Sequence, residues 1–210
     1  MFPTSLFVLR QLVHLDRDDF VKYVVCPSCS SLYDPGDCTQ WIRGNIVAKC
    51  CTHKAFKKGK CAKECGAKLA KKVLLSDGKA CFSPFKVYCF YSVINQLEAM
   101  LKRPTFAQKC EHWRERNVTD GLYSDVYDGQ VWKDFMTYNG KDFLKLPRSL
   151  GFALNVDWFQ PYTRRSDVSL GVIYLVLLNL PREERFKWEN VILVGVIPGM
   201  ETMPKSINPF

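Results

Sequence analysis

Cysteines near the N-terminus are the first residues in this chain whose type and spacing could do chemistry. Cys26-Pro-Ser-Cys29 is a C-x2-C pair, in which a tight turn lets two thiolates converge on one tetrahedral metal ion. Gly66, directly after Cys65, allows the backbone to turn beneath such an ion. The pattern predicts a zinc site, whose second pair of ligands comes from the residues in range of the first: Cys51, His53, Cys61 and Cys65.

The alternative for these cysteines is a small domain with reduced, half-buried thiols and no metal. Residues 26–65 contain few large apolar side chains, so this segment lacks the core that it would need to fold without a metal. The chain has 10 cysteines in 210 residues, and its first nine residues lack the basic region of a secretory signal. We therefore expect a reducing compartment, where clustered cysteines more often bind metal than form disulfides.

Basic residues are concentrated in the same segment. Between Arg43 and Lys72 there are ten basic residues and one acid, whereas the remainder of the chain is balanced and the formal net charge is +9. Lysines contact phosphates as point charges. Only two aromatic residues in or beside this segment could stack on bases, Trp41 and Phe56. The alternative is a solvated loop between metal ligands. The pattern predicts DNA-backbone binding, without base preference, by six lysines: Lys54, Lys57, Lys58, Lys60, Lys71 and Lys72.

Composition excludes two other classes of protein. With 47% hydrophobic and 24% charged residues, the chain has enough apolar material for a core, which excludes wholesale disorder. The longest apolar run, Leu170–Leu178, has nine residues, whereas a membrane-spanning helix needs about 20. We therefore expect no membrane partner.

The periodicity of apolar residues predicts an α+β chain in four parts. They are an N-terminal helix at 1–21, the cysteine-rich basic zinc module at 22–75, a helical connector at 76–148, and a domain that begins with strands at 149–210. The last part contains three runs rich in Val, Ile and Leu that predict strands: Phe152–Asp157, Leu170–Leu178 and Val191–Ile197.

Asp157 lies at the end of the first of these strands. Alternation places Leu154 and Val156 on one face of that strand, with Asn155 and Asp157 on the other. An aspartate held by a buried strand is a rigid carboxylate, of the kind that two-metal phosphodiester cleavage requires. The alternative is an Asp that only caps a turn. The acids nearer the C-terminus are expected to form a charged loop with basic neighbours: Glu183, Glu184 and Glu189.

Five collinear segments, starting at about residue 20, together resemble the N-terminal half of the CACTA (En/Spm-like) DNA transposases. They are Tyr23-Val-Val-Cys-Pro-Ser-Cys-Ser-Ser-Leu-Tyr-Asp34, Cys65-Gly-Ala-Lys-Leu69, Asp125-Val-Tyr-Asp-Gly-Gln-Val-Trp-Lys-Asp-Phe135, Leu154-Asn-Val-Asp-Trp-Phe-Gln-Pro161 and Asn179-Leu-Pro-Arg-Glu-Glu-Arg185. The resemblance implies a nuclear, DNA-binding protein with a zinc module ahead of an RNase H-like catalytic domain. It implies the zinc ligands Cys26, Cys29, Cys51 and Cys65, whereas Cys50, His53 and Cys61 match less clearly.

The same resemblance places Asp157 as the first acid of a catalytic triad that works with Mg²⁺ or Mn²⁺. Only 53 residues follow Asp157, and they are too few to present the second and third acids. We therefore expect a transposase fragment that binds DNA, has the full-length transposase as a second partner, takes no small-molecule substrate and is inactive alone. The alternatives are a stand-alone zinc-containing nucleic-acid-binding protein, acting as a repressor or a recruited host factor, and a protein-interaction module with an acidic partner.

Overall fold

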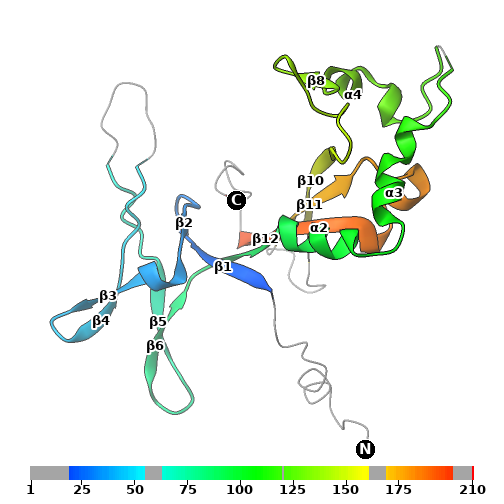
Figure 1. The fold of residues 1–210 in the computed structure, drawn as a ribbon. Helices are drawn as coiled ribbons and strands as arrows, with labels where there is room; N and C mark the ends of the chain where they lie inside the picture. The colour runs from blue at the N-terminus through cyan, green and yellow to red at the C-terminus, as the bar shows by residue number, and fades with distance from the viewer. Residues whose placement is uncertain (1–18, 55–62, 120, 161–168, 201–209) are drawn as a thin grey trace, which may run out of the picture. The chain divides into compact units, whose positions relative to one another are not determined.

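The chain folds as a mixed α+β protein with mostly antiparallel strands, as expected. The computed structural model describes residues 19–54, 63–119, 121–160, 169–200 and 210. The chain divides into two compact units between Ser92 and Val93 (Figure 1). Of the helix expected at 1–21, residues 1–18 lie outside the described residues, and Phe20 already begins a strand.

The first unit is built from strands and hairpins. Its central strand is β1 (Phe20–Val25), which pairs antiparallel with β2 (Leu32–Tyr33) and with β7 (Val87–Tyr91). A short 3-10 helix, η1 (Pro35–Cys38), follows β2. Two hairpins complete the unit: β3 (Thr39–Ile42) with β4 (Asn45–Ala48), and β5 (Ala70–Leu74) with β6 (Ala80–Pro84).

The core of the first unit is small and contains several cysteines. The buried side chains that pack together here are Val24, Cys26, Cys38, Cys51 and Leu69. Only two of these five are aliphatic, and the other buried apolar residues described in this unit are Val25, Ala70 and Tyr88, so the apolar area removed from water is modest. This agrees with the expectation that the segment needs more than its apolar residues to hold its fold.

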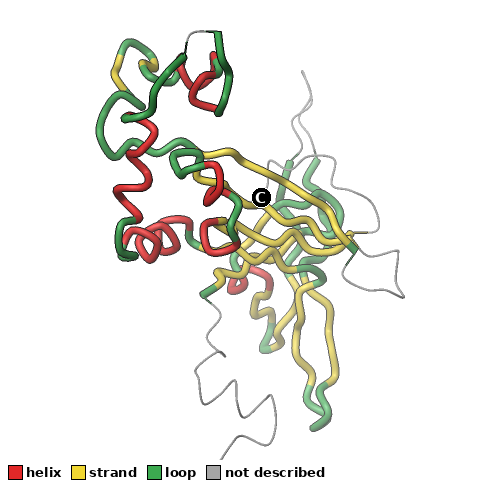
Figure 2. Tube along the Cα trace, turned by 90° about the vertical axis from the view of Figure 1, so that its right-hand side faces the viewer, coloured by secondary structure: helices red, strands yellow, loops and turns green. Residues whose placement is uncertain are grey.

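The segment expected to be a helical connector from residue 76 begins instead with strands. Val87-Tyr-Cys-Phe-Tyr91 is rich in aromatic and β-branched residues, and it pairs with β1 in a register that places Tyr91 opposite Phe20. Helices start at Val93, where apolar residues recur every three to four positions. They are short and joined by loops (Figure 2): α2 (Val93–Leu101), α3 (Phe106–Glu111), η2 (His112–Arg114), η3 (Val126–Asp128) and α4 (Gln130–Asp134).

Three long antiparallel strands in the order β10, β11, β12 form the sheet of the second unit, and they confirm the three strands expected at the C-terminal end. They are β10 (Phe152–Phe159), β11 (Ser169–Leu177) and β12 (Val191–Met200). A two-stranded ribbon precedes them: β8 (Thr137–Tyr138) and β9 (Lys141–Asp142). The connection from β11 to β12 carries α5 (Arg182–Arg185) and η4 (Trp188–Asn190).

Helix α2 packs on β12 and covers part of this sheet (Figure 1). The Gln96 side chain fixes the contact, because its Nε2 donates to the Leu193 carbonyl at 2.7 Å and its Oε1 accepts from the Leu193 N–H at 3.0 Å. The core beneath contains six buried side chains: Met100, Phe106, Cys110, Leu177, Leu180 and Ile192. Among the described residues, no helix combines the length and the apolar character needed to cross a bilayer.

Candidate metal centre

Two of the four converging cysteines lie in the turn that follows β1. Cys26 comes directly after the strand, and its backbone N–H donates to the Ser31 carbonyl at 2.9 Å. The Ser30 N–H donates back to the Cys26 carbonyl at 3.0 Å, and Ser30 takes a left-handed conformation with φ 63°. The tight turn expected of a C-x2-C pair is therefore present, and it brings Cys29 back towards Cys26.

The other two cysteines lie on the two segments of a short antiparallel pairing, of residues 50–54 with 64–68. The Cys51 N–H donates to the Ala67 carbonyl at 2.8 Å, and the Gly66 N–H donates to the Cys51 carbonyl at 2.9 Å. Gly66 has φ 70°, a conformation that glycine adopts without steric cost. This backbone places Cys51 and Cys65 next to each other.

The four thiols form one compact group. The Sγ atoms of Cys26, Cys29, Cys51 and Cys65 all lie within 4.8 Å of one another. Cys26 Sγ is 3.7 Å from Cys65 Sγ, and Cys29 Sγ is 3.4 Å from Cys51 Sγ. Four thiolates around a tetrahedral zinc at about 2.3 Å have sulfurs about 3.8 Å apart, whereas a disulfide requires about 2.05 Å. The distances therefore fit a metal ion held by four sulfurs and do not fit disulfides.

Without a cation, holding these thiols in their ionised form away from water costs free energy. Burial raises the pKa of Cys26 and of Cys51, because a lone thiolate loses its hydration. Cys65 differs, because a hydrogen bond from the Ala67 backbone N–H lowers the pKa of its thiol to about 7. A coordinated divalent metal deprotonates its thiol ligands. An ion at the centre of the group would therefore offset the negative charge of the buried thiolates.

Tyr33 is a contributor that the ligand spacing did not reveal. Its hydroxyl donates to Cys51 Sγ at 3.0 Å and accepts from the Thr52 N–H at 3.0 Å. A hydrogen-bond donor to a metal-bound thiolate orients this ligand and partly offsets its negative charge. The only sequence signal was the position of Tyr33 in the same short segment as the C-x2-C pair.

The other residues considered as ligands lie apart from the group. Cys50 and His53 are exposed, and His53 contributes its backbone carbonyl, which accepts from the Cys65 N–H at 2.8 Å. Cys61 lies outside the described residues. Within the part of the chain that the structure describes, the four cysteines are the one group of three or more Cys, His, Asp or Glu side chains close enough to share an ion.

The six lysines expected to bind DNA are only partly described. Lys54 is exposed and pairs with Glu64 at 3.5 Å. Lys71 and Lys72 are exposed neighbours on β5, so they point to opposite faces of the β5–β6 hairpin. Lys57, Lys58 and Lys60 lie outside the described residues.

Asp157 lies in β10 opposite Val172 and is exposed. The strand continues beyond it to Phe159, so Asp157 does not end the strand as expected. Its Oδ1 accepts from the backbone N–H of Trp158, the next residue of the strand, at 2.8 Å. None of the described acidic residues joins Asp157 in a group that could hold a metal ion.

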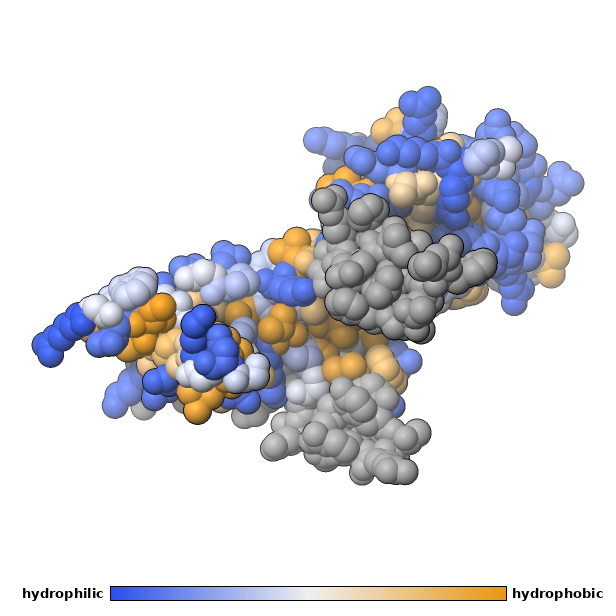
Figure 3. All heavy atoms as spheres, turned by 90° about the horizontal axis from the view of Figure 1, so that it is seen from below, coloured by the Kyte–Doolittle hydropathy of each residue, from blue (hydrophilic) through white to orange (hydrophobic). Residues whose placement is uncertain are grey.

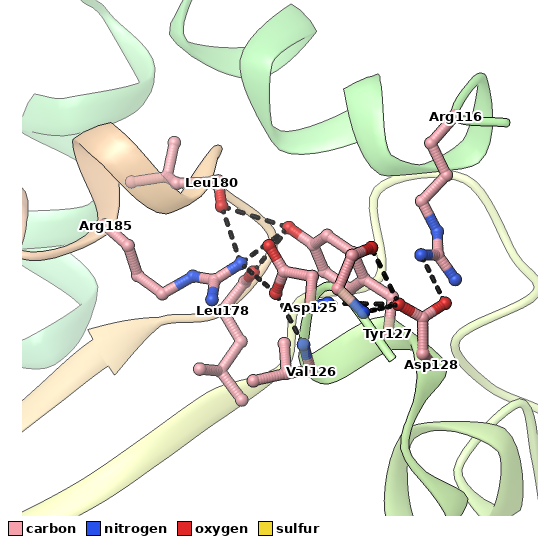
Figure 4. Close-up of polar contacts among 9 residues, drawn as sticks. Arg116, Asp125, Val126, Tyr127, Asp128, Leu178, Leu180 and Arg185 are labelled. Carbon is pink, nitrogen blue, oxygen red and sulfur yellow. Dashed lines mark hydrogen bonds and ion pairs between the residues drawn. The ribbon is translucent and has the colours of Figure 1, made fainter. Parts of the chain in front are cut away.

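Two of the segments that carry the resemblance meet in one buried polar network of the second unit (Figure 4). The Arg185 side chain is 4% exposed, and its Nη2 lies 2.9 Å from Asp125 Oδ1 and 3.0 Å from the Tyr127 hydroxyl. The same nitrogen donates to the Leu180 carbonyl at 3.0 Å, and the Tyr127 hydroxyl donates to the Leu178 carbonyl at 2.8 Å. The network holds α5 against the segment that begins at Asp125.

Asp128, from the same segment, has a structural role as well. It accepts from the backbone N–H groups of Asp125 and Ser124 and pairs with Arg116 (Figure 4). These contacts hold the pKa of the Asp128 carboxyl well below its ordinary value. Glu184 pairs with Lys187, as expected for a charged loop, and it also pairs at 2.8 Å with Lys109, which is distant in sequence and was not expected.

A search for relatives returned no match among protein-family models, curated proteins or solved structures.

Proposed function

We propose that this chain is the N-terminal portion of a CACTA-type DNA transposase and that its first unit is a zinc-braced, DNA-binding module. The observation that carries the proposal is the convergence of four cysteine thiols within 4.8 Å of one another, two of which, Cys51 and Cys65, lie in the most basic segment of the chain. The assignment to this class of protein rests on the collinear resemblance of the sequence to the family. The same resemblance implies a nuclear location and the full-length transposase as a further partner.

Zinc in this centre has a structural role. Cys26, Cys29, Cys51 and Cys65 supply four ligands, which fills the tetrahedral coordination of zinc and leaves no open position for substrate. The ion joins the turn after β1 to the pairing of residues 50–54 with 64–68, and so fixes both ends of the lysine-rich segment between them. Because the apolar core of this unit is small, metal binding supplies much of its folding free energy.

The lysines supply affinity for phosphate. Ten basic residues against one acid over residues 43–72 attract a polyanion, and lysine contacts carry no base readout. DNA binding is therefore weak, without sequence preference and strongly dependent on salt.

The test of DNA binding measures affinity for a duplex across a salt series. Replacing four lysines by Ala is expected to reduce the slope of log K against log salt by roughly two to four units: Lys54, Lys57, Lys58 and Lys60. A control variant removes the same charge from exposed positions of the second unit: Lys102, Lys133, Lys141 and Lys145. An equal change in both variants would mean that net charge, and not the basic segment, governs binding.

The second unit begins an RNase H-like catalytic domain in this proposal, with Asp157 as the first of its acids. The support is the antiparallel order of β10, β11 and β12 with an exposed aspartate on the first strand. Two-metal cleavage with Mg²⁺ or Mn²⁺ needs several carboxylates around the ions. Because Asp157 belongs to no group of three or more potential metal ligands among the described residues, a stand-alone zinc-containing nucleic-acid-binding protein is the second candidate.

A further inference from the structure

The β3–β4 hairpin of the first unit presents an aromatic ring to solvent at its tip. The strands pair Trp41 with Ile46 and Ile42 with Asn45, which leaves Arg43 and Gly44 as a two-residue turn. Both turn residues have positive φ, 50° and 78°, as the tight hairpin turn requires. The Trp41 side chain is 72% exposed, although indole rings are among the side chains that folded proteins most often bury.

The surroundings of Trp41 are apolar and basic together. Ile46, on the facing strand, and Ile42, beside it in sequence, are both exposed large hydrophobic residues. At the left end of Figure 3, where this hairpin lies, hydrophobic residues sit beside hydrophilic ones at the surface. Arg43 occupies a left-handed turn position that Asn or Gly adopts more easily, so a guanidinium stands at the hairpin tip at some conformational cost.

This combination matches one class of ligand. A nucleobase has an apolar π-face that stacks on an indole, and the phosphate attached to it accepts hydrogen bonds from a guanidinium. The apolar residues alone would fit a membrane or a hydrophobic protein groove. The positive charge of residues 43–72 favours a polyanion instead. In a duplex both faces of each base are already stacked, so the ring requires an unpaired base.

We infer that Trp41 and Arg43, at the tip of the β3–β4 hairpin, bind an unpaired base of single-stranded DNA. Trp41 stacks on the base, Ile46 supports the ring from the facing strand, and Arg43 contacts the phosphate. The inference rests on the proposed DNA binding, since the lysines supply the general affinity. It adds a preference for unpaired DNA, which the sequence, with its two aromatic residues near the lysines, did not favour.

The test uses the full chain and two labelled probes at one salt concentration, an oligothymidylate of 20 nucleotides and a 20-base-pair duplex. Trp41→Ala is expected to weaken binding of the oligothymidylate by about 5- to 100-fold and to change duplex binding less than about twofold. Trp41→Phe keeps an aromatic face and is expected to retain most of the affinity. Trp188→Ala removes a tryptophan that is 91% exposed in the second unit and serves as the matched control, with both affinities unchanged.

The outcomes separate this inference from the proposed function. If the unmodified chain binds neither probe, the proposed DNA binding is wrong and the inference falls with it. If the chain binds both probes but Trp41→Ala weakens them equally or leaves both unchanged, only the inference is overturned. Zinc content of Trp41→Ala, measured in the same preparation, is expected to equal that of the unmodified chain because the side chain is exposed.

Discussion

Replacing Arg185 by Met tests how the second unit is held together. Methionine is a flexible apolar side chain, so this change mainly removes a buried charge that pairs with Asp125 at 2.9 Å and contacts the Tyr127 hydroxyl and the Leu180 carbonyl. Breaking a buried ion pair by deleting one partner costs about 3–5 kcal/mol of folding stability. The Asp125 side chain is 16% exposed and is reached by water, so we expect a loss at the lower end, about 3 kcal/mol.

Urea unfolding followed by tryptophan fluorescence measures this loss, because Trp113 and Trp132 are buried in the second unit beside Tyr127. A loss of about 3 kcal/mol lowers the midpoint of this transition by about 1–3 M urea. The matched control is Arg182→Met, an exposed arginine in the same short helix, whose effect should stay within about 0.5 kcal/mol. Equal stability of the two variants would refute the view that the buried network joins α5 to the segment starting at Asp125.

Three further predictions concern single residues. Asp128→Asn should destabilise the second unit at neutral pH, because the folded state lowers the pKa of the Asp128 carboxyl. The stability that the ionised carboxylate contributes is present above the ordinary aspartate pKa of about 4 and is lost as the pH falls below it. Urea midpoints of this variant should therefore depend less on pH between about 5 and 2 than those of the unmodified chain. Gly151→Ala should cost about 1–3 kcal/mol in thermal unfolding, because a Cβ there would lie 2.8 Å from the Trp132 ring, whereas Gly36→Ala has nothing within 4 Å and should be neutral. Asp157→Ala should change neither the zinc content nor the result of a DNA nicking assay with Mg²⁺ or Mn²⁺, in which we expect no cleavage by the 210-residue chain. Cleavage that depends on Asp157 would show that other acids complete a site with it.

Local patterns predicted the parts of the structure that local residues determine. The C-x2-C pair forms the expected turn, because the turn needs only the six residues from Cys26 to Ser31. The runs that became β10, β11 and β12 were recognisable from Val, Ile and Leu content, with their first residues within one position of those expected and their last residues displaced by one to three positions. Strand β7 was missed, since only Ser92 separates its apolar run from the helical repeat that starts at Val93.

Contacts between distant residues could not be predicted in the same way. Cys50, Cys51 and His53 are close in sequence, and only the pairing of residues 50–54 with 64–68 decides that Cys51 is the one whose side chain joins Cys65. Asp125 and Arg185 are 60 residues apart, so nothing in either segment alone indicates that they form a buried pair. The charges could be counted from the sequence, but their partners depend on the tertiary fold.

The zinc content of three matched preparations tests the account most directly. The unmodified chain, Cys51→Ala and Cys50→Ala are purified without added metal, and bound metal is measured per chain by mass spectrometry of the elements. The account predicts about one zinc in the unmodified chain and in Cys50→Ala, where the thiol is exposed and apart from the group. It predicts loss of zinc, together with protease sensitivity of residues 22–75, in Cys51→Ala. A folded unmodified chain without metal, or a Cys51→Ala variant that keeps its zinc, would contradict the four-cysteine centre.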